Sequence, residues 1–513
     1  MVSLLIDCSE IISPTMTPFK LNQKLRRITF FLLLLTVSLL LVLGLSIPSL
    51  AATPLHYTQL TFAPLPEVQV PPYERYQLDN GLVIYLMEDR ELPLVSGTAI
   101  IRTGQRWEPP AKIGVADLVG QVMRMGGTLS HSAAELNRLL EQKAASVEAG
   151  IGVSSGSVRF NALSDDLDEV FSLFAEVLRE PSFASEQLEL AKLGERGSIA
   201  RRNDDPEKIA SREFRKLIYG ERSPYARTLD YNTLDKINRE DLVSFYQEAI
   251  SPNQIILGII GDFEPSQVRK LIQTKLGDWH SKPTLNSPLP PVQQVTPNGV
   301  FLVDQPQLTQ SYVQIGHLGS QLNIPEFAAL GVLNEVMNGF GGRLFNQVRS
   351  RQGLAYSVYG VWSPQFDYPG LFIMGGQTRS SATVPFIQSL KQEMMKIRSI
   401  PIQPRELAFA KDSFLNSYVF NFQDPAQTLS RLMRYEYFHY PLDFLTRYRQ
   451  GVENTTVSQV QLAANKYLKP ERLVTLVVGN SKDIQPTLSS LDGASSIQRI
   501  DISTMPPSKH DSG

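Results

Sequence analysis

The segment Gly114-Val-Ala-Asp-Leu-Val-Gly-Gln-Val-Met-Arg-Met-Gly-Gly-Thr128 decides how this chain is organised. Its apolar residues recur at helical spacing, so the segment predicts an amphipathic helix closed by a pair of glycines. Farther along the chain the same pattern returns. Val119-Gly-Gln-Val-Met123 aligns with Leu333-Asn-Glu-Val-Met337, and the closing pair returns as Gly341-Gly342. One structural element is therefore present twice.

The repetition extends well beyond this helix. Ser251-Pro-Asn-Gln-Ile-Ile-Leu-Gly-Ile-Ile-Gly261, which predicts a buried strand over residues 255–260, aligns with Lys469-Pro-Glu-Arg-Leu-Val-Thr-Leu-Val-Val-Gly479. Asp205-Pro206 aligns with Asp424-Pro425, and each pair stands in front of a helical stretch. The offsets lie near ~215 residues, far longer than the period of a solenoid, so the chain contains a duplicated domain.

Each copy has the pattern of an α+β domain. In the first copy, Asp79-Asn80-Gly81 lies between two alternating segments and is a strong hairpin signal. The other elements predicted there are a strand at residues 95–101, helices at 114–125, 133–143, 165–178 and 207–218, and a half-buried hairpin at 147–160. Strands and helices in separate runs favour an antiparallel sheet with helices on one face.

The domain boundaries follow from these patterns. Residues 56–280 form the predicted first domain and residues 299–481 the second, with a flexible tail at 482–513. A proline-rich segment at residues 281–298 lies between them. Its prolines cannot donate hydrogen bonds to a sheet and favour extended backbone, so it is predicted to be a semi-rigid linker.

The N-terminal segment predicts export. Residues 28–47 are continuously apolar and are followed by Ser49-Leu50-Ala51, a plausible cleavage site. The basic residues that precede the run are Lys20, Lys24, Arg26 and Arg27. Residues 1–52 are therefore predicted to be a signal peptide, although the run is also long enough to be an uncleaved membrane anchor. Both readings place the folded part in the periplasm or another extracytoplasmic space. A start at Met16 rather than Met1 stays open.

Charge and cysteine content exclude several classes of site. The chain of 513 residues carries a net charge of −2, with no basic stretch that would indicate nucleic-acid binding. Its one cysteine, Cys8, precedes the apolar run and would be lost with the leader. Disulfides and thiolate zinc sites are therefore excluded from the mature protein.

The segment of residues 114–128 resembles the active-site helix of the M16 (pitrilysin or insulinase type) metallopeptidases, G-L-A-H-x-x-E-H-x-x-x-x-G-T. The family's two zinc-binding histidines correspond to Asp117 and Gln121, and its glutamate base corresponds to Gly120. A third ligand, expected about seventy-seven residues later, falls on Ser198 by an ungapped count, with Glu195 close by. Because zinc hydrolysis needs three protein ligands and a carboxylate base, the resemblance implies a degenerate site and no metal bound by this chain.

One other pair of residues has metal-ligand spacing. His131 and Glu135 stand at i and i+4 and could share a helix face. No third ligand lies near them in the sequence, so they are predicted to form a solvated first helical turn with capping character.

The second copy retains what the first has lost. Gly341-Gly-Arg-Leu-Phe-Asn-Gln-Val-Arg-Ser-Arg-Gln-Gly-Leu-Ala-Tyr-Ser-Val-Tyr359 resembles the family's C-terminal active-site segment, in which an arginine and a tyrosine reach the substrate. Those positions are Arg349 and Tyr356. A tyrosine hydroxyl can donate to a developing oxyanion, and an arginine can hold a peptide carbonyl or carboxylate. The alternative is a solvated arginine and a tyrosine packed on a strand.

The resemblance also implies a strand that binds peptide backbone at a sheet edge. The matching residues are Val147, Glu148, Ala149, Gly150, Ile151 and Gly152. Glycines let a second backbone approach closely, and main-chain pairing gives affinity with little sequence preference. A glycine-bearing edge hairpin that binds nothing remains the alternative.

Together these features imply two homologous M16-type (LuxS/metallopeptidase-like) α/β sandwich domains across about residues 70–480. They resemble the non-catalytic subunit of a two-chain peptidase, whose homologous partner carries H-x-x-E-H and the zinc and which acts on short or unfolded peptides. Three alternatives stay open: a structural scaffold, a stand-alone peptide-binding or chaperone module, and a self-sufficient peptidase with an unrecognised metal site.

Overall fold

The computed structural model describes most of the chain after the leader. The described residues are 32, 33, 35, 36, 70–282, 289, 291–339, 341–491 and 497–503. They fall into two units, Met1–Pro66 and Glu67–Gly513. Most of the predicted leader, including its cleavage site, Cys8 and most of the apolar run, lies outside the described residues.

The described part of the N-terminal unit is helical at residues 32, 33, 35 and 36. There the Thr36 hydroxyl donates to the carbonyl oxygens of Leu32 and Leu33. Over all the residues that the structure describes, none of the helices is both long and apolar enough to span a bilayer.

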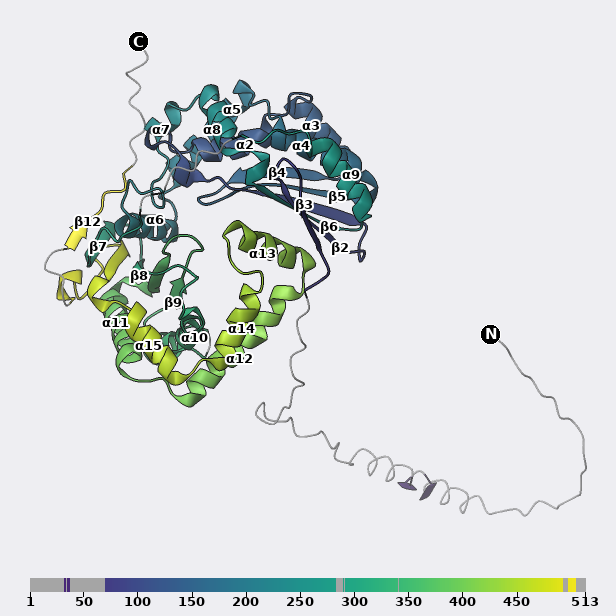
Figure 1. Ribbon diagram of the computed structural model, residues 1–513. Helices are drawn as coiled ribbons and strands as arrows, with labels where there is room; N and C mark the ends of the chain where they lie inside the picture. Colours follow the sequence, from purple (N-terminus) through teal and green to yellow (C-terminus); the bar gives the residue numbers. More distant parts are fainter. Residues whose placement is uncertain are drawn as a thin grey trace, which may run out of the picture. The chain divides into compact units, whose positions relative to one another are not determined.

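The unit Glu67–Gly513 is built around two six-stranded sheets among the described residues (Figure 1). The first has the order β1-β2-β6-β3-β5-β4, with β1 (Glu74–Gln77), β2 (Val83–Glu88), β3 (Leu94–Ile101), β4 (Ser146–Ile151), β5 (Gly156–Leu163) and β6 (Ile255–Gly261). The second has the order β12-β7-β11-β8-β10-β9, with β7 (Gly299–Asp304), β8 (Gln310–Leu318), β9 (Ser357–Ser363), β10 (Leu371–Arg379), β11 (Val474–Gly479) and β12 (Ile497–Arg499). The shared order from β2 and β7 onward agrees with the duplication seen in the sequence.

Both sheets are mixed rather than antiparallel throughout. β2 runs parallel to β6, and β7 runs parallel to β11 and β12, whereas the other neighbours are antiparallel. The cause is the connection between the first and last strands of each repeat. It includes most of the helices of that half, and such a long crossover lets the last strand return in the same direction as the first.

Each half also contains its own set of helices. The first half contains α2 (Val115–Met125), α3 (Ala133–Gln142), α4 (Leu167–Arg179), α5 (Ser185–Arg201), α6 (Pro206–Tyr219), α7 (Tyr231–Asp235), α8 (Arg239–Ala249) and α9 (Pro265–Leu276). The second contains α10 (Phe327–Met337), the π-helix η6 (Phe345–Arg351), α11 (Thr383–Ser399), α12 (Pro404–Tyr418), α13 (Pro425–Tyr437), α14 (Phe444–Asn454) and α15 (Val457–Tyr467).

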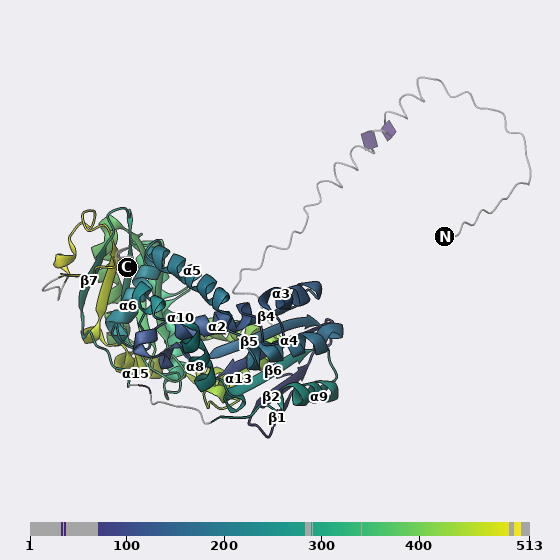
Figure 2. The same ribbon diagram turned by 90° about the horizontal axis from the view of Figure 1, so that it is seen from above.

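The two halves exchange one helix each. On β6, Leu257 and Ile259 pack with the helices of their own half, whereas Ile256 and Ile260 point to the other face and pack with Met433 of α13. In the reverse direction α6 packs on β8 and β11 of the second sheet. Figures 1 and 2 show α13 beside the first sheet and α6 beside the second. This exchange corrects the expectation of helices on one face, because the opposite face of each sheet is covered by the other half.

The exchanged helices are the two that follow the repeated Asp-Pro pair. Asp205 and Asp424 are their N-caps, and each accepts a backbone hydrogen bond, from Glu207 N at 2.9 Å and from Ala426 N at 2.8 Å. The proline at the first helical position has no N–H to leave unpaired there.

Parts of the predicted linker and tail are anchored to the second half. The Gln294 side-chain amide donates to the carbonyls of Thr296 and Arg472 at 2.7 and 2.8 Å. Linker residues 283–288 and 290 lie outside the described residues. β12 belongs to the segment predicted as a flexible tail, and it adds an edge strand next to β7. β12 is only three residues long, too short to be recognised from sequence.

Candidate functional site: a degenerate metal-binding helix

Helix α2 begins against a buried carboxylate. Gly114 is its N-cap, with a left-handed φ of 100°. The Glu108 side chain accepts hydrogen bonds from Gly114 N at 3.1 Å and Ala116 N at 2.9 Å. Burial raises the pKa of Glu108 to about 7, although these two hydrogen bonds and the nearby Arg227 oppose the shift. The start of the helix is therefore fixed by a residue outside the family motif.

Two of the positions matched to the family's metal site, Asp117 and Gln121, lie together with Glu195. The Gln121 side-chain amide nitrogen donates to Asp117 Oδ2 at 3.0 Å and to Glu195 Oε1 at 2.8 Å. Burial raises the pKa of Asp117, and the negative charge of Glu195 raises it further, while the hydrogen bond from Gln121 lowers it. The amide thus bridges two carboxylates, and its two N–H groups partly offset their repulsion.

Of the two residues considered for the third position, Glu195 faces Gln121 and Ser198 does not. Both residues are on α5, but Ser198 is exposed and its hydroxyl donates to Gly194 O at 3.2 Å. Glu195 lies three residues earlier, almost one helical turn, and faces α2. An ungapped count makes no allowance for differences in loop length between α2 and α5. A carboxylate three residues from the counted position was the available signal.

Gly120 packs against the backbone of β4. A Cβ atom at this position would lie 2.6 Å from Ile151 N and 2.7 Å from Gly150 Cα. α2 and β4 are therefore in backbone contact, and a glutamate side chain has no room here while the strand keeps its place. The residue that corresponds to the family's base acts as a packing glycine.

This set of residues does not fit a catalytic zinc ion. Such a site takes three protein ligands and an open position for water, with histidine the usual nitrogen donor. Here two carboxylates accept from an amide that points its N–H groups between them. Over the described ranges, no group of three histidine, cysteine, aspartate or glutamate side chains could hold a metal ion.

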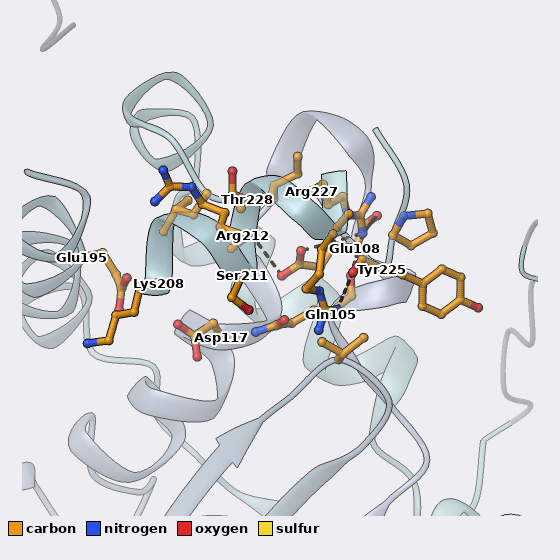
Figure 3. Close-up of a pocket in the computed structure, with 17 residues that line it drawn as sticks. Gln105, Glu108, Asp117, Glu195, Lys208, Ser211, Arg212, Tyr225, Arg227 and Thr228 are labelled. Carbon is orange, nitrogen blue, oxygen red and sulfur yellow. Dashed lines mark hydrogen bonds and ion pairs between the residues drawn. The ribbon is translucent and has the colours of Figure 1, made fainter. Parts of the chain in front are cut away.

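A cavity of about 410 Å³ opens beside these residues (Figure 3). Asp117 comes from α2, Glu195 from α5, and Lys208 and Ser211 from α6. The other lining residues are Gln105, Glu108, Ile113, Gly114, Val153, Arg212, Arg215, Pro224, Tyr225, Ala226, Arg227, Thr228 and Leu229. The lining thus carries both acidic and basic groups, and it includes neither residue of the predicted arginine–tyrosine pair.

Arg349 and Tyr356 meet at the surface of the second half. Arg349 lies on η6, and its guanidinium carbon is 5.7 Å from the Tyr356 ring centroid and 4.9 Å from that of Phe345. Arg349 is exposed and Tyr356 is 76% exposed, just before β9. The side chain is therefore not packed on the strand, although its backbone N–H donates to Gln377 O at 3.0 Å. Two adjacent polar groups are thus presented to solvent.

The predicted peptide-pairing residues form an edge strand. β4 is the last strand of the first sheet, and Val147, Glu148, Ala149, Gly150 and Ile151 lie within it, with Gly152 next in the chain. Two of its carbonyl oxygens already accept side-chain hydrogen bonds. Val147 O accepts from Arg124 Nε at 2.6 Å and Ile151 O from Gln105 Nε2 at 3.4 Å. An added strand would have to replace those contacts.

The i, i+4 pair in the next helix makes separate contacts. His131 Nδ1 lies 2.8 Å from Glu176 Oε2, whereas Glu135 pairs with Arg138. Ser132 caps α3 by accepting from Glu135 N at 3.3 Å. The two side chains do not form a metal site.

Comparison with known proteins identifies the family. A profile described as insulinase (peptidase family M16) matches residues 87–223, and one described as peptidase M16 inactive domain matches residues 236–414. The chain belongs to the M16 peptidase family. Similarity to this family does not by itself imply peptidase activity, because one relative is named as a non-peptidase homolog.

Two similar proteins and one solved structure show how this chain compares with others of the family. An uncharacterized zinc protease YmxG of Bacillus subtilis is 23% identical over 360 residues, which cover 70% of this chain and 86% of that protein. A non-peptidase homolog YmxG of Helicobacter pylori is 22% identical over 408 residues, covering 78% and 92%. The crystal structure of a peptidase M16 inactive domain from Pseudomonas fluorescens has a TM-score of 0.74 at 23% identity, covering 81% of this chain and 100% of that one. At this identity the structural likeness establishes the shared fold.

Proposed function

We propose that this chain is the non-catalytic, peptide-binding subunit of an exported M16-type peptidase complex. A homologous partner with an intact H-x-x-E-H motif would hold the zinc, and this chain would supply Arg349 and Tyr356 to the substrate bound there. The substrates would be short or unfolded peptides. Export rests on the apolar leader with its basic flank, and a membrane role would come only through an uncleaved leader.

The observation that carries this proposal is the exposure of the arginine–tyrosine pair. The Tyr356 side chain is 76% exposed and lies beside Arg349, so it buries little apolar surface and contributes little to the stability of its own domain. Its hydroxyl is free to donate to a developing oxyanion, and the guanidinium can hold a carbonyl or carboxylate. The pair does not line the cavity beside Asp117, which supports a reacting carbonyl that is presented by another chain.

A stand-alone peptide-binding protein is the second candidate. The edge position of β4 favours it, because an edge strand can pair with an extended peptide without any partner subunit. A structural scaffold would need neither activity. Peptide binding by the isolated chain separates the stand-alone binder from a subunit that acts only within a complex.

The test compares the rate of peptide hydrolysis by the purified complex that contains the wild-type chain with the rate of the complex that contains the Tyr356→Phe variant. Loss of one oxyanion donor should lower kcat about 10- to 1000-fold with KM nearly unchanged. Tyr359→Phe is the matched control, because that hydroxyl accepts a hydrogen bond from Gln314 within its own sheet. Equal kcat for wild type and Tyr356→Phe, or an equal loss in the control, would refute the role in trans.

A further inference from the structure

A second cavity, of about 480 Å³, lies between the exchanged helix α13 and the first sheet. It shares no lining residue with the cavity beside Asp117. Thr98 of β3 and Arg159 of β5 face it from the sheet, and these two residues are directly opposite each other in the β3–β5 register. The other lining residues are Phe366, Asp424, Ala426, Gln427, Ser430, Arg431, Arg434 and Tyr435.

The three arginines of this cavity differ in how they are held. Arg431 is fixed by Asn421, to whose backbone and side-chain oxygens its two terminal nitrogens donate at 2.7 and 2.8 Å. Arg159 and Arg434 are exposed, and neither has an ion pair or a side-chain hydrogen bond with any residue that the structure describes. Two guanidinium groups with ten N–H donors between them therefore face the cavity without a protein partner.

Little negative charge balances them. Of the lining residues only Asp424 is acidic, and its Oδ1 accepts from Ala426 N at the start of α13. Glu148 of the edge strand β4 stands opposite Arg159 in the β4–β5 register, yet the two form no ion pair within 4.0 Å. The cavity therefore has a positive excess that a bound anion would neutralise.

We propose that the arginine cavity formed by Arg159, Arg431 and Arg434 binds a carboxylate of an acidic peptide. The guanidinium fork matches a carboxylate bidentately, and the aromatic walls at Phe366 and Tyr435 suit the apolar part of a peptide. Arg159 is one strand away from the edge strand β4. A peptide held there would have its acidic side chains or its C-terminal carboxylate within reach of the cavity. The inference rests on the peptide binding proposed above, and it adds a preference for acidic substrates.

The experiment compares two labelled peptides by fluorescence anisotropy with the full chain. One is an extended peptide with several glutamates and a free C-terminus. The other has glutamine at the same places and an amidated C-terminus. Wild type should bind the acidic peptide about tenfold more tightly, the gain of one or two charge-assisted hydrogen bonds in a partly exposed site.

The variant Arg159→Gln/Arg434→Gln should abolish this preference and leave the affinity for the glutamine peptide unchanged. Both side chains are exposed and unpartnered, so the fold should tolerate the change. Arg405→Gln, at an exposed arginine in the first turn of α12, is the control for loss of a positive charge outside the cavity and should keep the preference. Peptides with only the side-chain or only the terminal carboxylate show which of them is bound.

The possible outcomes separate the two proposals. Equal affinity of wild type for both peptides, or a preference that survives in the double variant, overturns the carboxylate site but not peptide binding. Failure of both peptides to bind overturns peptide binding by the chain itself, and the carboxylate site with it. Inorganic phosphate and free glutamate are also tested as competitors of the acidic peptide. If the two compete equally well, the cavity is a general anion site and the proposed preference for acidic peptides is wrong.

Discussion

Replacing Gly120 by alanine should destabilise the protein, although alanine is the better helix former. In a helix interior this exchange gains up to about 1 kcal/mol from backbone entropy. Here the new Cβ would lie 2.6 Å from Ile151 N and 2.7 Å from Gly150 Cα. Both are backbone atoms of β4, so no side chain can rotate away to make room. Overpacking of this kind costs about 1–3 kcal/mol.

The net effect should be a loss of about 1–2 kcal/mol in the free energy of unfolding, measured by urea denaturation followed by circular dichroism. Gly194→Ala is the matched control. Gly194 is also within a helix of the first half, is exposed, and has no atom within 4 Å of its virtual Cβ. It should gain about 0.5–1 kcal/mol. Equal stabilisation by both substitutions would show that α2 and β4 are not in backbone contact.

The same contact limits any attempt to rebuild a peptidase here. Restoring glutamate at Gly120 adds a larger side chain to the position that lacks room for a methyl group. Histidines at Asp117 and Gln121 would therefore not be sufficient for hydrolysis. β4 would first have to move away from α2.

Two further predictions concern stability. Glu108 has a pKa of about 7 in the folded state, above its ordinary value of 4.5. Because the folded protein then favours the protonated form, the contribution of Glu108 to stability should be fully present below about pH 4.5 and be lost as the pH rises to about 7. Glu108→Gln keeps an acceptor for Gly114 N and Ala116 N, so it should flatten this part of the urea-midpoint profile, and parallel profiles would contradict the assignment. Met433→Ala should cost about 2–4 kcal/mol, since the side chain is 1% exposed between α13 and the first sheet. Met125→Ala, at a position 42% exposed, should change the urea midpoint much less.

Local sequence patterns were sufficient to predict many of the helices and strands and the duplication of the domain. The helix predicted at residues 114–125 is α2 (Val115–Met125), and the Asp-Pro pairs do start helices. Hydrophobic periodicity shows that α6 has an apolar face but does not show what covers it. Because the two halves carry the same pattern, either sheet could have received either helix. The exchange is a tertiary choice that periodicity does not encode.

The candidate site could also be predicted only in part. Asp117, Gly120 and Gln121 were found by matching the family's motif, because all three lie on one helix and helical geometry fixes their spacing. The count fell on Ser198, three residues from Glu195, because this position depends on loop lengths between helices. The cavity of Arg159 and Arg434 could not be foreseen, since it joins a strand of one half to a helix of the other.

The exchange of α6 and α13 has a consequence for how such a chain could arise. A polypeptide of half this length would leave one apolar sheet face, such as that of Ile256 and Ile260, open to water. A second copy could cover it by donating its own helix, which is the arrangement of a domain-swapped homodimer. Joining the copies through residues 281–298 makes that association unimolecular, so it no longer depends on protein concentration. Once joined, the two copies were free to diverge in sequence.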